Sequence, residues 1–252
     1  MSTQTIVFAN QKGGVGKTTS AVNIGAYLAE AGRKVLLLDF DPQGNLSSSV
    51  GADVDKPGMY EVITDQISAA KAMQETSVKN LSVIPVDINL TGASIELIEA
   101  EEREFFLKKA IAKFRDGWDY ILVDSPPSLG LLTLNGLVAA DRVFIPLQCE
   151  YFAMEGLSQL LKTIKMVQRA LNPQLKIGGI FFTMYDSRTN LANEVVQEVT
   201  GYFKKVVFKT IIPRNVKLSE APSHRVPINQ YNENCLGAKS YEKLAQEVIE
   251  RG

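Results

Sequence analysis

The sequence is poor in the residues that build several kinds of site. It has two cysteines, Cys149 and Cys235, and a single histidine, His224. Two distant cysteines make neither a disulfide framework nor a close-spaced metal motif, so we expect both to be reduced and structural. His224 lies in a proline-bounded loop with no visible nucleophile or metal partner, and we assign it no catalytic role.

Long apolar runs and an excess of charge are also missing. No segment has the roughly 18 continuous apolar residues that span a bilayer, and the polar N-terminus with its short apolar stretch does not resemble a signal peptide. The formal net charge is -1, so nucleic-acid binding would need a local basic patch. We expect a cytoplasmic protein.

What the sequence contains is an alternation of apolar β-rich runs and helical patterns along its whole length. Strands are predicted at 5–9, 35–39, 81–86, 120–124, 143–147, 177–183 and 206–211, and helices at 18–31, 93–114, 154–171, 191–203 and 238–251. Several strands are almost entirely apolar, as expected when helices cover both faces. We predict an α/β fold with a doubly wound, mostly parallel sheet, forming one domain over residues 1–252 because no Ser/Gly/Pro-rich linker divides the chain.

A glycine-rich loop joins the first predicted strand to the first predicted helix. It reads Lys12-Gly13-Gly14-Val15-Gly16-Lys17-Thr18-Thr19. Its glycines let backbone N–H groups converge on phosphate oxygens, and the helix N-terminus adds partial positive charge. Lys17 can reach the β- and γ-phosphates, and the Thr18 hydroxyl can ligate magnesium. The loop predicts a site for ATP or ADP with Mg²⁺, although Gln11 replaces the first glycine of the usual pattern and Lys12 stands inside the loop.

Two aspartates support nucleotide hydrolysis. Asp41 follows the predicted strand 35–39, and Asp124 ends the apolar strand 120–124. Residues just past the carboxyl ends of parallel strands face the ligand crevice. An aspartate at the end of an apolar strand is a Walker-B pattern, and Asp124 is suited to holding magnesium through water.

Five segments together resemble the deviant Walker-A ATPases, and specifically the ParA/Soj-type chromosome- and plasmid-partitioning ATPases. They are residues 9–19, 39–45, 123–127, 148–156 and 212–223, so the resemblance covers essentially the whole chain. It implies that Lys12 reaches across a nucleotide-sandwich homodimer to the partner's phosphates, and that Asp41 positions and polarises the attacking water. It also implies that Pro213 and Asn215 contact adenine.

The same resemblance implies a function. It indicates a DNA-segregation ATPase that dimerises with ATP, binds nucleoid DNA without sequence preference, and hydrolyses ATP when a ParB/Spo0J-like centromere-binding protein stimulates it. Slow intrinsic turnover is expected because no arginine finger in cis is evident. Arg188 and Lys217 stand where partitioning ATPases place residues for DNA binding. Residues 204–225 also carry six basic side chains against Glu220 alone, a pattern that equally fits a solvated surface.

Other interpretations stay open. A MinD-like, membrane-associated positioning ATPase would need a basic amphipathic C-terminal helix. The tail has an apolar stripe but a polar face rich in Glu242, Glu247 and Glu250, which favours packing on the core. We therefore expect no stable membrane association. The cysteines do not fit a cluster-bridged iron protein, and no substrate site for a metabolic enzyme is visible.

Three further features of the sequence bear on its function. The few residues before the first strand leave no room for the helix-turn-helix domain of larger plasmid partitioning ATPases. Glu150 and Glu155 follow a strand end, where one could contact the partner's ribose or both could be structural. Four acidic residues on the helix predicted at 93–114 are interpreted as a solvated face; they are Glu99, Glu101, Glu102 and Glu104.

Overall fold

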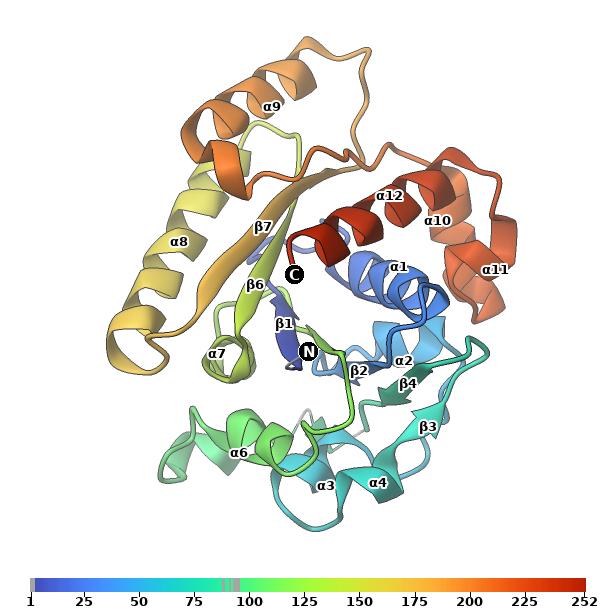
Figure 1. The fold of residues 1–252 in the computed structure, drawn as a ribbon. Coiled ribbons are helices and arrows are strands. Elements are labelled where there is room, and N and C mark those ends of the chain that lie inside the picture. The colour runs from blue at the N-terminus through green and yellow to red at the C-terminus, as the bar shows by residue number, and fades with distance from the viewer. Residues whose placement is uncertain (1–2, 88, 91, 93–95) are drawn as a thin grey trace.

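The computed structural model describes residues 3–87, 89–90, 92 and 96–252 and contains a seven-stranded sheet (Figure 1). The strand order is β3-β4-β2-β5-β1-β6-β7. All neighbours pair in parallel except β3 with β4. The strands are β1 (Gln4–Phe8), β2 (Val35–Asp39), β3 (Gln74–Glu75), β4 (Leu81–Ile84), β5 (Tyr120–Asp124), β6 (Arg142–Gln148) and β7 (Lys176–Thr183). The predicted α/β class and mostly parallel sheet are confirmed.

Helices cover both faces of the sheet, because the central strands are apolar on both sides. One face carries α1 (Lys17–Glu30), α2 (Asn45–Ser49), α10 (Val216–Glu220), α11 (Ile228–Asn232) and α12 (Leu236–Glu250). The other carries α3 (Met59–Ile63), α4 (Ala69–Ala72), α6 (Phe106–Ala112), α7 (Leu131–Ala139), α8 (Ala153–Ala170) and α9 (Asn190–Phe203). The apolar stripe of α12 is buried against the sheet, as the tail's pattern predicted.

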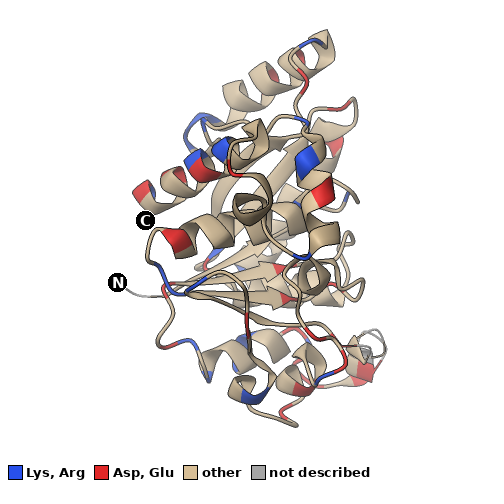
Figure 2. Ribbon diagram, turned by 90° about the vertical axis from the view of Figure 1, so that its right-hand side faces the viewer, with Lys and Arg blue, Asp and Glu red and all other residues tan. Residues whose placement is uncertain are grey.

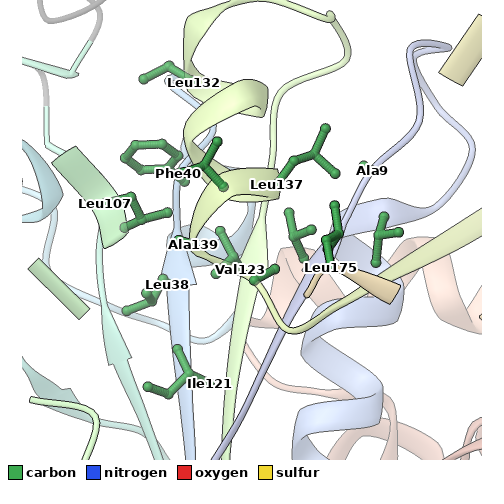
Figure 3. Packing of buried hydrophobic residues seen from close by; sticks show 14 of the residues in the cluster. Ala9, Leu38, Phe40, Leu107, Ile121, Val123, Leu132, Leu137, Ala139 and Leu175 are labelled. Carbon is green, nitrogen blue, oxygen red and sulfur yellow. The ribbon is translucent and has the colours of Figure 1, made fainter. Parts of the chain in front are cut away.

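Alternate residues of each strand feed two separate cores. In β1, Ile6 and Phe8 pack under α1 and α12, whereas Val7 packs under α7. Figure 3 shows the second core, where Val123 of the sheet lies near Leu137. Each of these fully buried side chains contributes about 1.5–3 kcal/mol of transfer free energy. The sheet therefore separates two hydrophobic cores, one on each of its faces.

The strand predicted at 206–211 is wrong. After the 3-10 turn η2 (Lys204–Val206), this segment makes one isolated bridge to β7, between Val207 and Ile180. The ring of Phe208 sits directly over Gly179, where an added Cβ would lie 1.9 Å from it. The segment therefore caps the edge of β7 and does not extend the sheet.

The continuous helix predicted at 93–114 is also wrong, and its predicted start lies outside the described residues. The structure has the short 3-10 turn η1 (Leu97–Glu99), an irregular stretch, and then α6. Glu102 has a left-handed backbone (φ 52°) that interrupts helix. The buried Asn135 side chain holds the break open, accepting from the Leu107 N–H and donating to the Arg103 carbonyl. The acidic cluster consequently does not share one helical face.

Candidate functional site

The glycine-rich loop curls between β1 and α1 as its composition predicted. Gly14 (φ 71°) and Gly16 (φ 86°) both occupy the left-handed region, which a side chain rarely tolerates. Gly16 immediately precedes α1, so the loop ends at a helix N-terminus. Unpaired N–H groups and the helix dipole meet there, which is the arrangement that binds phosphate.

Two side chains that the sequence reasoning missed fix this loop to the sheet. Asn10 donates from Nδ2 to the Pro146 carbonyl (2.8 Å) and accepts the Lys12 N–H (3.1 Å). Thr183, the last residue of β7, donates from Oγ1 to the Val15 carbonyl (2.8 Å). The position of Asn10, two residues after the end of β1, was the available signal. Nothing in the sequence connected Thr183 with a loop 168 residues away.

Lys17, Thr18 and Asp124 meet beneath the loop. Lys17 is 6% exposed, and its Nζ lies 3.4 Å from the Lys12 carbonyl. Burial lowers the pKa of Lys17, while the nearby Asp124 and Asp41 oppose that shift. Thr18 Oγ1 donates to Asp124 Oδ2 (2.6 Å), and the other oxygen, Oδ1, is buried without a hydrogen-bond partner.

Acidic residues stand at the arrowheads of strands in the middle of the sheet (Figure 2), because β2 and β5 both end on aspartate. Burial raises the pKa of Asp124 well above its ordinary range, with Asp39 as the next cause. Burial also raises the pKa of Asp39, to about 6. Both shifts arise chiefly from burial, which disfavours the charged form of a carboxyl group.

Asp39 and Asp41 hold different positions although they are two residues apart. Asp39 is fully buried and accepts hydrogen bonds from the Ser47 N–H (2.8 Å) and hydroxyl (2.6 Å). Asp41 is 6% exposed and its Oδ1 accepts the Gln43 N–H (3.1 Å). Asp39 therefore holds the segment between β2 and α2 in place, and Asp41 lies beyond the end of β2, near Lys17.

Lys12 lies on the outer side of the loop. Its side chain is 46% exposed and forms an ion pair with Glu150, which follows β6. Gln11 lies beside it and donates from Nε2 to Gln159 of α8 (2.9 Å). Glu155 is exposed in the first turn of α8. The structure thus joins Glu150, but not Glu155, to the loop.

A cavity of about 190 Å³ opens beside the loop. Gly16 and Thr19 line one side, and Pro213 and Asn215 line the other. Asn215 also caps α10, since its side chain accepts the Lys217 N–H (3.0 Å). Met184, a non-glycine residue with φ 50°, completes the wall and had no sequence signal. The predicted phosphate-side and base-side residues therefore share one cavity.

The two residues predicted to bind DNA are already paired; Arg188 is exposed and Lys217 is partly buried. Arg188 makes a bidentate contact with Asp186 (2.8 and 2.6 Å), which holds the pKa of Asp186 far below its ordinary value. Lys217 contacts Glu220 (2.8 Å). Any phosphate that bound these cations would compete with a carboxylate for each of them.

The remaining polar candidates have local roles. His224 packs against the ring of Tyr231, with centroids 4.7 Å apart. Cys149 and Cys235 are free thiols, as expected, and Cys235 accepts the Ala238 N–H at the start of α12. Among the residues that the structure describes, no helix is both long and apolar enough to cross a membrane.

Comparison with known proteins gives one consistent result. Residues 3–177 match the family model described as an AAA domain. The chain is 60% identical over 248 residues to the chromosome-partitioning ATPase Soj of Treponema pallidum, covering 98% of each chain. It is 52% identical over 250 residues to the sporulation initiation inhibitor protein Soj of Bacillus subtilis, again covering 98% of each.

A solved structure shares both the fold and much of the sequence. It is cobyrinic acid a,c-diamide synthase from Mycobacterium smegmatis with bound ADP and magnesium. The TM-score is 0.86 at 40% identity, covering 98% of this chain and 94% of that chain. A relative with the same fold therefore binds ADP and magnesium.

Proposed function

This chain belongs to the Soj/ParA family of chromosome-partitioning ATPases, and we propose that it is an ATP-driven DNA-segregation switch. In this proposal one ATPase domain over residues 1–252 dimerises when it binds ATP and attaches to nucleoid DNA without sequence preference. A ParB-like partner then stimulates its slow hydrolysis of ATP to ADP and phosphate. The observation that carries the proposal is the phosphate loop, with Thr18 bonded to Asp124 beneath it and Lys12 exposed on its outer side.

The nucleotide would span the loop and the neighbouring cavity. Backbone N–H groups of 13–19, at the N-terminus of α1, would receive the phosphates, together with the Lys17 ammonium. The base would enter the 190 Å³ cavity between Thr19 and the Pro213–Asn215 segment. Binding of phosphates would also reverse the burial penalty on Lys17, because a polyanion favours its charged form.

The residues beneath the loop fit a magnesium ion. Thr18 Oγ1 and the carboxylate of Asp124 are hard oxygen donors, which Mg²⁺ prefers. The buried and unpartnered Oδ1 of Asp124 supports the same assignment. Mg²⁺ is usually held by one or two protein groups together with phosphates and water, so two protein ligands suffice for such a site. When bound, the ion would neutralise charge on the phosphate oxygens.

Asp41 would orient and polarise the attacking water. It lies past the end of β2, near enough to Lys17 to stabilise its charge. Asp39 supports this position by accepting the Asp41 N–H (3.3 Å) with one oxygen and Ser47 with the other. Holding the Asp41 backbone in this way limits the loss of orientation that slows a poorly positioned reaction.

Lys12 would act across the dimer. In the single chain it pairs with Glu150, and half of its side chain is exposed. An exposed ion pair contributes little to stability, so phosphate charge from a second copy can displace it. A cation beside the β–γ bridge would stabilise charge building on the leaving oxygen. ATP would then join the two chains, since its phosphates would lie at their interface.

One experiment separates DNA partitioning from membrane positioning. An Asp41→Ala variant, which should bind ATP without hydrolysing it, is mixed with duplex DNA or with phosphatidylglycerol vesicles, in ADP and in ATP. We expect ATP-dependent DNA binding that weakens steeply with salt, and no vesicle binding. Vesicle binding without DNA binding would overturn the proposal in favour of a MinD-like function.

A second experiment tests the role of Lys12 in trans. Lys12→Ala should keep nucleotide binding and lose the ATP-dependent dimer, measured by light scattering. Lys34→Ala is the matched control, because Lys34 is also exposed but precedes β2 at the opposite end of the strands. An unchanged dimer in Lys12→Ala would contradict the role.

A further inference from the structure

An apolar pocket lies on the face of the sheet opposite α1, between α7 and α8, two neighbouring helices of that face (Figure 1). Its volume is about 490 Å³, within the range of ligand-binding clefts. Apolar side chains of both helices line it, including Leu131, Leu134 and Leu137 of α7 and Met166, Val167 and Ala170 of α8. Met166 is 62% exposed at its edge, and Leu129 is 37% exposed. The nucleotide site does not use this surface.

A stripe of cations borders the pocket. Lys162, Lys165 and Arg169 are exposed on α8 at spacings of three and four residues, so they line up over about 10 Å of helix. In the described part of the chain none of the three forms an ion pair. Met166 is four residues from Lys162 and three from Arg169, so the stripe and the pocket share an edge.

We propose that this α7–α8 pocket docks an acidic, amphipathic helical segment of a protein partner. Apolar side chains on one face of the segment would enter the pocket, and carboxylates beside them would meet Lys162, Lys165 and Arg169. Helices bind grooves in this way through anchors three and four residues apart. The three cations on α8 are also three and four residues apart, so the acidic side chains of a docked helix could meet them. The cations have the same sign and form no ion pair with the described residues, which favours an acidic partner.

The geometry favours a peptide over the two other anionic partners. A membrane surface is bound by apolar side chains that protrude into it, whereas this apolar surface is hollow. A DNA backbone would satisfy the cations but would leave the apolar pocket unfilled, since phosphate contacts need no apolar cavity. The phosphate loop contacts α8 at Gln159, through Gln11, whereas the pocket is lined by residues from Thr163 onward on the same helix.

The proposal is tested by selecting peptide ligands from a random library. A displayed library of random helix-forming peptides, each about 16 residues or four turns long, is selected on the full chain. The enriched peptides should be acidic, with apolar residues at helical spacing, and should bind more weakly as salt increases, measured by fluorescence anisotropy. Peptides that are neutral or basic, or no enrichment, would overturn the proposal.

Variants then locate the binding. Met166→Asp, and separately the combined Lys162→Glu, Lys165→Glu and Arg169→Glu variant, should each weaken the selected peptide at least about tenfold. Lys243→Glu, an exposed lysine on α12 at the other face, should leave it unchanged. Unaltered ADP binding and circular dichroism show that each variant is folded.

Two further measurements can refute the assignment. If phosphatidylglycerol vesicles bind the wild-type chain and not the triple charge variant, the stripe is a lipid surface. If the triple variant loses duplex DNA affinity while Lys243→Glu does not, the stripe belongs to the DNA surface. If the Met166→Asp variant still binds the peptide, the pocket is not the peptide-binding site.

Discussion

Replacing Ser47 with alanine should loosen the loop that carries Asp41. The Ser47 hydroxyl donates to the buried carboxylate of Asp39 (2.6 Å) and accepts the Val86 N–H (3.0 Å). A hydrogen bond to a charged group is worth about 1.5–3 kcal/mol, and a buried N–H stripped of its partner costs about 1–3 kcal/mol. We expect Ser47→Ala to lower the free energy of unfolding by about 3 kcal/mol or more at pH 7.5.

The cost should depend on pH through Asp39. Its pKa is raised to about 6 from an ordinary 3.8, so the folded chain binds this proton more tightly than the unfolded chain. The Asp39 contribution to stability is therefore fully present below about pH 4 and falls by about 3 kcal/mol as pH rises through 6. The Ser47 hydroxyl lowers this pKa by favouring the carboxylate. Ser47→Ala should consequently cost about 1 kcal/mol less at pH 5 than at pH 7.5.

Urea denaturation of the nucleotide-free chain in EDTA at both pH values measures these quantities. Ser49→Ala is the control, since Ser49 is buried on the same short helix but donates only to the Asn45 carbonyl within it (2.6 Å). A Ser47→Ala cost equal to that of Ser49→Ala, or the same at both pH values, would refute the reasoning.

Three other outcomes follow from local geometry. Gly179→Ala should destabilise the chain by about 3 kcal/mol in urea denaturation, because a Cβ there would lie 1.9 Å from the Phe208 ring. Gly201→Ala, in the exposed last turns of α9 with open space around it, should instead stabilise by about 0.5–1 kcal/mol; equal effects would contradict both. Asp186→Asn should strengthen ATP-dependent DNA binding at low salt by freeing Arg188, and unchanged binding by filter retention would remove Arg188 from the DNA surface.

The fold was predictable because its strongest signals are local. The apolar runs at 35–39 and 120–124 are buried strands with the predicted bounds, and the loop between β1 and α1 follows from its glycines. The errors came where long-range packing decided the conformation. Asn135 interrupts the predicted helix from another element, and the contact of Phe208 with Gly179 turns an apolar segment into a cap for the sheet edge.

In the candidate site, too, local sequence patterns predicted some residues, and contacts between distant positions determined the others. Lys17, Thr18 and Asp124 could be predicted because each stands at the start of a helix or the end of a strand in a recognisable pattern. Asn10 and Thr183, which hold the loop in place, could not be predicted as its supports, since their partners are Pro146 and Val15 at distant positions. The carboxylate partners of Arg188 and Lys217 stand two and three residues away, so their pairing was accessible but was not weighed.

The two edges of the sheet have a consequence for how this protein tolerates crowding. At one edge the terminal strand, β3, has only two residues. At the other, Phe208 and Ile212 donate their N–H groups to the carbonyls of Ile180 and Phe182 of β7, so two of that strand's carbonyls are already paired. Neither edge presents a long open ladder, and open ladders are what let folded chains aggregate by adding strand to strand. The two edges of the sheet therefore give other copies of the chain little backbone to pair with, so strand addition is not an easy route to self-association.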